Sequence, residues 1–180
     1  MTKMKRSLIL LMLICISTTA RPPAVSYTEL NRKTAEYNKA MAILEYQKYY
    51  WKMAQSESNL NWQVVNSKGY FGLFQFGEST LHDLGYNINS KQFKDNPNIF
   101  TPSMQFEAMD SLTKRNERQL KDVIDRHTGD TISGFIVSKW SILAASHLGG
   151  VTGTHNYFEK GLNKSDGRTT IEDYIKKFAK

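Results

Sequence analysis

The chain has 180 residues, 40% of them hydrophobic and 23% charged, which favours one globular domain with a real core. Its net charge of +7 favours anionic partners. However, no segment concentrates Lys and Arg densely enough for a nucleic-acid face, and no recognition-helix or zinc-finger pattern is present. We therefore expect no nucleic-acid partner.

Residues 1–20 have the pattern of a secretory signal peptide. Lys3, Lys5 and Arg6 form a positive start, 8–16 is a short apolar run, and 18–20 offers small residues for cleavage after Ala20. The run is about half of the ~20 residues that a membrane span needs, so an uncleaved anchor is the weaker alternative. We expect an exported protein of the periplasm, cell envelope or exterior, without stable membrane insertion after cleavage.

The single cysteine, Cys15, lies inside this apolar run. Ile14 before it is not small, which disfavours a lipoprotein cleavage site. The mature chain would then have no thiol, so a disulfide, a thiolate metal site and a cysteine nucleophile are excluded.

Residues 21–27 are expected to be a linker, and 28–180 one domain. Ser26 and Glu29 fit a capping box, followed by a long helix, or two helices, to about Gln55, whose aromatic end at 49–51 is expected to be buried. A small β-hairpin is predicted over 62–76. Further helices are expected at 78–83, from 102 to near 129, at 137–147 until Gly149-Gly150 stops the helix, and at 169–180, with loops over 86–102 and 151–168. The predicted fold class is mainly α, a helical bundle with a small β-hairpin beside the first long helix.

Glu57 is the candidate catalytic residue. Glycosidic cleavage needs a carboxyl group that stays protonated near neutral pH, and apolar surroundings favour that state. Trp51 and Met53 before Glu57, and Leu60 and Trp62 after it, predict such surroundings. Periodicity alone favours an ordinary surface carboxylate at the end of a helix, although an acid is electrostatically disfavoured there.

Four motifs change that balance. They are Glu57-Ser58, the segment Gly72-Leu73-Phe74-Gln75, the segment 144–150 (Ala-Ala-Ser-His-Leu-Gly-Gly), and Tyr174 within 170–175. In this order they resemble the lytic transglycosylase catalytic domain, a relative of goose-type lysozyme, over roughly residues 40–178. Glu-Ser and Gly-Leu-x-Gln are the specific part of the resemblance, and the two later motifs are weaker.

The resemblance implies a lysozyme-like (α+β) fold and one catalytic carboxylate. Glu57 would protonate the oxygen between MurNAc and GlcNAc and then, as a base, help the muramic 6-hydroxyl close a 1,6-anhydro ring. A second carboxylate, as in two-carboxylate glycosidases, would not be needed. The same resemblance implies substrate-binding roles for Ser58, Gly72, Leu73, Gln75, Phe76, His147 and Tyr174, with Tyr174 orienting Glu57.

The sequence departs from the family pattern in three places. His147 stands where an Asn is usual, and both core packing and groove lining are open roles for it. Glu78 replaces a proline, and its position favours a helix-start carboxylate over a second catalytic group. Thr170-Ile171 replaces Glu-Thr before Tyr174. The resemblance is therefore to an atypical branch of the family.

Peptidoglycan glycan strands are the expected partner of a monomeric enzyme, with no cofactor and no metal. The histidines lack a zinc-binding spacing, and 77–81 lacks the second glycine of a nucleophile elbow. Two alternatives stay open: a hydrolytic muramidase on the same fold, and a non-catalytic peptidoglycan-binding protein of an envelope-spanning assembly. Exo or endo cleavage and dependence on peptide stems do not follow from the sequence.

Overall fold

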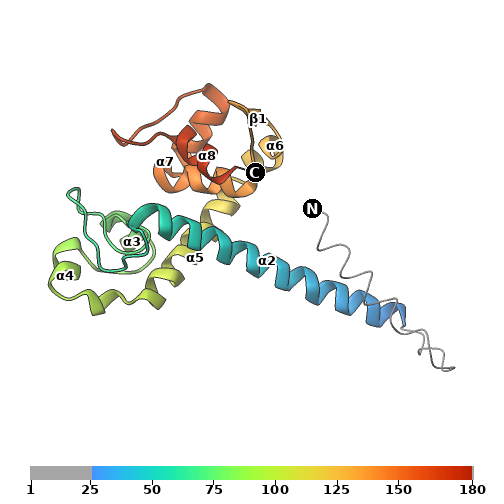
Figure 1. Ribbon diagram of the computed structural model, residues 1–180, viewed down its shortest axis with the longest axis horizontal. Coiled ribbons are helices and arrows are strands. Elements are labelled where there is room, and N and C mark those ends of the chain that lie inside the picture. Colours follow the sequence, from blue (N-terminus) through green and yellow to red (C-terminus); the bar gives the residue numbers. More distant parts are fainter. Residues whose placement is uncertain (1–25, 180) are drawn as a thin grey trace. The chain divides into compact units, whose positions relative to one another are not determined.

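The computed structural model describes residues 26–179 of the chain, and Figure 1 shows its helices and strands in order. The predicted signal peptide and most of the predicted linker lie outside these residues. Helix accounts for 67% of the structure, with a small two-stranded antiparallel sheet, so the mainly α fold with a small hairpin is confirmed. None of the described helices combines the length and apolarity needed to cross a membrane.

The residues that the structure describes fall into two units, one that ends at Ile43 and one that begins at Leu44. Of the first unit, the structure describes Ser26 and the helical residues up to 43. Ser26 Oγ accepts the backbone N–H of Glu29 at 3.1 Å, as expected for the start of this helix, and Arg32 pairs with Glu29 and Glu36. The first long helix, α2, is assigned over Tyr27–Ser58.

In the second unit, α2 carries the first part of the core. Tyr49, Tyr50, Met53 and Ala54 are buried, but Trp51 is 57% exposed, so the expected burial of the aromatic end is right for two of its three rings. The helix ends where Asn59 and Leu60 turn into the left-handed region, and the Leu60 N–H reaches the carbonyl of Ala54 at 3.2 Å. This closure satisfies a terminal carbonyl and ends the helix directly after Glu57 and Ser58.

The predicted hairpin over 62–76 is a tightly turned loop with isolated bridges, Val65 with Phe71 and Phe71 with Phe76. Positive φ angles at Gly69, Gly72 and Gln75 interrupt the extended backbone too often for a ladder to form. The two-stranded sheet lies elsewhere, between β1 (Thr131–Ile132) and β2 (Phe135–Ile136).

Three phenylalanines anchor the 62–76 loop to the core. Phe71, Phe74 and Phe76 are each at most 2% exposed, so all three belong to the core. Phe71 stacks on Phe93 of a later helix at a ring-centroid distance of 4.8 Å. The loop is thus held by apolar packing in place of strand pairing.

Short helices connect this loop to the second half of the unit: α3 (Glu78–Asp83), α4 (Ser90–Asp95) and the 3₁₀ helix η1 (Pro97–Phe100). Helix α3 matches the prediction, but the predicted loop over 86–102 contains α4 and η1. The long helix expected from residue 102 is two helices, α5 (Pro102–Gln119) and α6 (Lys121–His127). They separate at Leu120, which is fully buried.

Helix α7 (Lys139–Lys160) packs against α5, α6 and α8 (Ile171–Phe178) (Figure 1). The predicted helix end at Gly149-Gly150, and with it the predicted loop over 151–160, is wrong. Gly150 has φ 68° and ψ 176°, so it kinks the chain, and helix resumes after it. At Gly149 a Cβ would lie 2.6 Å from Ile171 Cδ1, so the absent side chain allows α7 to approach α8 closely.

Candidate active site

A cleft of about 660 Å³ opens within the second unit. This volume is in the range of small-molecule and cofactor sites. Five of the predicted site residues line it: Glu57, Gln75, Phe76, His147 and Tyr174. They come from the end of α2, the 62–76 loop, α7 and α8, so distant parts of the sequence meet in one cavity.

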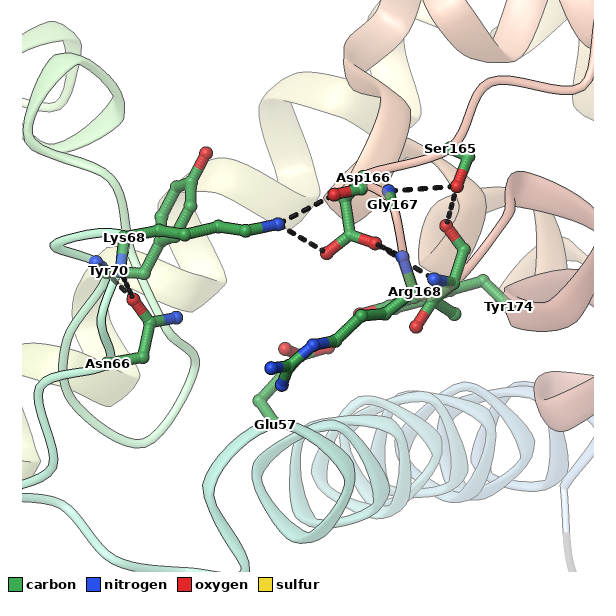
Figure 2. A network of polar contacts seen from close by, with 10 residues as sticks. Glu57, Asn66, Lys68, Tyr70, Ser165, Asp166, Gly167, Arg168 and Tyr174 are labelled. Atoms are coloured by element: carbon green, nitrogen blue, oxygen red, sulfur yellow. Dashed lines mark hydrogen bonds and ion pairs between the residues drawn. The ribbon is translucent and has the colours of Figure 1, made fainter.

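Glu57 and Tyr174 are in direct contact in this cleft. The Tyr174 hydroxyl, from α8, donates a hydrogen bond to Glu57 Oε1 in the last turn of α2. Figure 2 shows Glu57 at the helix end, with Tyr174 beyond it. Tyr174 is 8% exposed and Glu57 is half-buried, so the carboxyl group is held by a fixed partner and remains open to the cleft.

Burial raises the pKa of the Tyr174 phenol, and the charge of Glu57 and the hydrogen bond to it raise that pKa further. Tyr174 therefore stays protonated and remains a hydrogen-bond donor throughout the neutral range. Its position fits the orienting role that the motif resemblance implied.

Gln75 lines the cleft in a left-handed conformation, with φ 49°. Its Nε2 donates to the carbonyl of Gly72 at 2.9 Å, a bond that holds the amide across its own turn. A left-handed conformation at a residue other than glycine costs free energy. Here the turn directs the amide side chain toward the cavity that Glu57 faces.

Gln105 was not predicted as part of this region, and it supports the loop from behind. Its buried side chain accepts the Leu73 N–H at 2.7 Å and donates to the carbonyls of Phe100 and Trp62 at 2.7 and 3.1 Å. A Cβ on Gly72 would lie 2.6 Å from Gln105 Oε1. Gly72 is therefore needed to admit this amide, in addition to its φ of 80°.

Three residues with expected substrate roles do not line the cleft. Ser58 turns its hydroxyl back to the carbonyl of Ala54 at 3.1 Å, a bond within the last turn of α2. Gly72 and Leu73 lie behind the wall, where Leu73 is 5% exposed and bonded to Gln105. The structure thus gives these three residues places in the scaffold of the site.

His147 combines the two roles that its sequence position left open. It lines the cleft, and its Nε2 lies 2.8 Å from the carbonyl of Phe74. A carbonyl can only accept, so Nε2 donates, and His147 links α7 to the 62–76 loop. Its Nδ1 is buried and has no hydrogen-bond partner among the described residues.

Glu78 makes structural hydrogen bonds and has no catalytic position, in agreement with the helix-start role that its sequence position favours. Its carboxylate accepts the Ser90 N–H and hydroxyl at 2.9 and 2.8 Å, which joins α3 to the start of α4. These two bonds lower the pKa of Glu78. Glu78 does not line the cleft, which leaves Glu57, Asp83 and Asp166 as its lining carboxylates.

An ion pair joins the 62–76 loop to the segment before α8. Lys68 Nζ lies 3.7 Å from Asp166 Oδ2 and donates to the Asp166 carbonyl at 2.6 Å. Figure 2 shows Lys68 extended toward Asp166, with Glu57 on α2 below them in this view. Asp166 lines the cleft and is fixed by the N–H groups of Arg168 and Thr169, each at 2.9 Å, which hold its pKa low.

Within residues 26–179, no group of three or more His, Cys, Asp or Glu side chains is arranged to hold a metal ion. No protein-family model, curated protein or solved structure matches the chain. The likeness to lytic transglycosylases therefore depends on the four motifs themselves and stays a prediction. What the geometry offers chemically is one oriented carboxyl group beside an amide-bearing wall.

Proposed function

We propose that the chain is a peptidoglycan lytic transglycosylase with Glu57 as its single general acid and base. The observation that carries this proposal is the hydrogen bond from Tyr174 to Glu57 inside the cleft that Gln75 also lines. Glu57 and Tyr174 belong to two separate motifs of the resemblance, 117 positions apart in the chain. A chance surface carboxylate would not be expected to meet that particular phenol.

In the proposed reaction, protonated Glu57 gives its proton to the oxygen between MurNAc and GlcNAc as the glycosidic bond breaks. GlcNAc leaves with that proton as a free hydroxyl. The muramic 6-hydroxyl then forms a bond to the anomeric carbon, and its proton returns to Glu57. No water is consumed, so one carboxyl group suffices where two-carboxylate glycosidases need a pair.

The other groups of the site support this chemistry by position. Tyr174 directs one carboxyl oxygen, which leaves the other oxygen to face the substrate. The Gln75 amide lies on the wall that would meet the sugar acetamido or lactyl groups. His147 and Gln105 hold that wall through the Phe74 carbonyl and the Leu73 N–H. Pre-organisation of this kind is worth more in a partly dry cleft than in water.

Digestion of purified sacculi followed by mass analysis of the products tests the proposal. The wild type should release muropeptides ending in 1,6-anhydro-MurNAc, lighter by one water than hydrolysed ones. Glu57→Gln should lower the release at least about 10²-fold, because both proton transfers are lost. Glu107→Gln, an exposed acid on α5 outside the cleft, is the matched control and should keep full release.

Each unexpected result of the digestion would support a different function. Full release by Glu57→Gln would overturn the assignment. Products that carry the added water would replace the lyase with a hydrolytic muramidase. Sacculi that bind the wild type but yield nothing soluble would leave a glycan-binding protein. A folded Glu57→Gln variant, checked by circular dichroism, makes each outcome interpretable.

A further inference from the structure

One face of helix α5 lines the cleft. Leu112, Arg115, Asn116 and Gln119 all contribute to its wall, at positions i, i+3, i+4 and i+7. This spacing places them along a single stripe of the helix. Three of the four carry hydrogen-bonding side chains, so α5 presents a polar strip to the cavity.

Some charged side chains of α5 form ion pairs, and Arg115 does not within the described residues. Lys114 pairs with Asp110 at 2.7 Å, and Glu117 pairs with Lys139 at 3.0 Å. Arg115 has no ion pair and no side-chain hydrogen bond with any residue from 26 to 179. It is half-buried, and it lines the same cavity as Glu57.

Two polar neighbours, Asn116 and Gln119, lie beside Arg115 on this stripe. Asn116 is 5% exposed, and its Nδ2 is fixed to Ser146 Oγ at 3.1 Å, so this part of the helix is anchored. Gln119, one turn beyond Arg115, forms no side-chain hydrogen bond within the described residues. A guanidinium group and an amide one turn apart can together meet a carboxylate and an adjacent peptide group.

We propose that Arg115, with Gln119 beside it, binds a carboxylate carried by a substituent of the sugar chain. A guanidinium presents a planar fork that matches a carboxylate with two parallel hydrogen bonds. A neutral sugar hydroxyl would leave the positive charge unpaired in the cleft. This inference deepens the proposed function, on which it rests, because it adds a charged substituent to the recognised glycan.

Two sources could supply that carboxylate: the peptide stem, or the lactyl group of muramic acid after the stem is removed. Three disaccharides separate them. The first carries a tetrapeptide stem, the second carries a free lactyl carboxylate, and the third carries a lactyl carboxamide with no carboxylate. Binding is measured by isothermal titration calorimetry in the Glu57→Gln background, so that the ligand is not cleaved.

The first or the second ligand should bind at least about tenfold more tightly than the third, as charge-assisted hydrogen bonds allow. Arg115→Gln should remove this preference. Arg118→Gln removes the same charge from an exposed position of α5 outside the cleft, and it should keep the preference. The ligand that holds the advantage identifies the source of the carboxylate.

Equal affinities for the three ligands, absence of binding, or a preference that survives Arg115→Gln would each overturn the inference. Thermal unfolding of Arg115→Gln checks that the variant is folded. The sacculus digestion judges the proposed function separately, because it measures bond cleavage by the wild type. A cleaving enzyme with no carboxylate preference would lose this inference and keep the proposed function.

Discussion

At the scale of single residues, the site depends on one hydrogen bond between side chains that the sequence separates widely. Tyr174 has no other hydrogen-bond partner for its hydroxyl among the described residues, and its ring is held by burial in α8. Among the described residues, the Tyr174 hydroxyl therefore donates to Glu57 alone. A carboxyl group at the end of a helix would otherwise sample several rotamers, and the hydrogen bond limits it to the one that faces the cleft.

Tyr174→Phe should lower product release at least about tenfold, because the catalytic carboxyl group loses its orienting donor. The same change should lower the free energy of unfolding by about 1 kcal/mol, the usual net value of one hydrogen bond. Release from sacculi and urea denaturation measure the two effects. Tyr86→Phe, a half-buried tyrosine outside the cleft, is the control, and it should keep its activity. Unchanged release by Tyr174→Phe would contradict the orienting role.

The same phenol predicts how stability depends on alkaline pH. Burial and the Glu57 charge raise the pKa of Tyr174 above its usual value of about 10. The folded state then holds the proton more strongly than the unfolded chain, so the stabilisation is complete below pH ~10 and is lost as pH rises beyond it. Denaturation at a series of pH values should show this fall, with a shallower slope in Tyr174→Phe. An unchanged slope in that variant would contradict the prediction.

At the scale of elements, the 62–76 loop is held in place by a side chain from outside it. Gln105 satisfies the Leu73 N–H and two carbonyls at once, and it is fully buried. An apolar residue of similar size would leave these backbone groups without partners. Each buried unsatisfied group costs about 1–3 kcal/mol.

Gln105→Leu should therefore lower the free energy of unfolding by at least about 2 kcal/mol. It should also lower the release of muropeptides, because the 62–76 loop that carries Gln75 would lose its hydrogen bonds to Gln105. Gln63→Leu, at an exposed position near the start of the same loop, should change stability by no more than about 0.5 kcal/mol. Urea denaturation of both variants measures the difference. A Gln105→Leu protein as stable as the wild type would show that packing of the phenylalanines alone holds the loop.

Sequence patterns predicted those elements whose signals are local. The cap at Ser26, the helix 78–83 and the final helix carry polar residues at the expected helix starts. Sequence patterns gave wrong helix boundaries where contacts between distant residues determine the backbone. The pair Gly149-Gly150 has the pattern of a helix end, but α7 continues past it. Gly149 leaves room for the Ile171 side chain, and Gly150 adopts the backbone angles of a kink. Leu120 has ordinary helical propensity, yet it separates α5 from α6, and its side chain is fully buried in a core cluster with Ile142 and Ile175.

At the scale of the whole molecule, the candidate site was predictable only in part. Glu57, Gln75, Phe76, His147 and Tyr174 were singled out because their motifs resemble a family, and the fold brings them to one cleft. Gln105 and Arg115 were missed, because a polar residue within an amphipathic helix pattern gives no sign of which neighbour it will meet. The resemblance predicts a substrate contact for Ser58, but its hydroxyl donates to the carbonyl of Ala54 within α2.

The pairing of Lys68 with Asp166 is a contact that only the folded second unit can create, since 98 positions separate the two residues. Both side chains are more than 40% exposed, and exposed ion pairs contribute little to stability because water and salt screen them. The backbone N–H groups of Arg168 and Thr169 also bind the Asp166 carboxylate, so Lys68 is not its only partner. The link across the cleft should therefore be weak and easily opened.

A double-mutant cycle with Lys68→Ala and Asp166→Ala should give a coupling of at most about 1 kcal/mol at low salt. The coupling should shrink further at 1 M salt, where the screening length falls to about 3 Å. Urea denaturation of the four proteins measures it, and Lys91→Ala with Asp95→Ala, an exposed pair within α4, supplies a reference cycle away from the cleft. A coupling that is large and independent of salt would mean that the two walls are locked together, so that a glycan strand could enter only from its end.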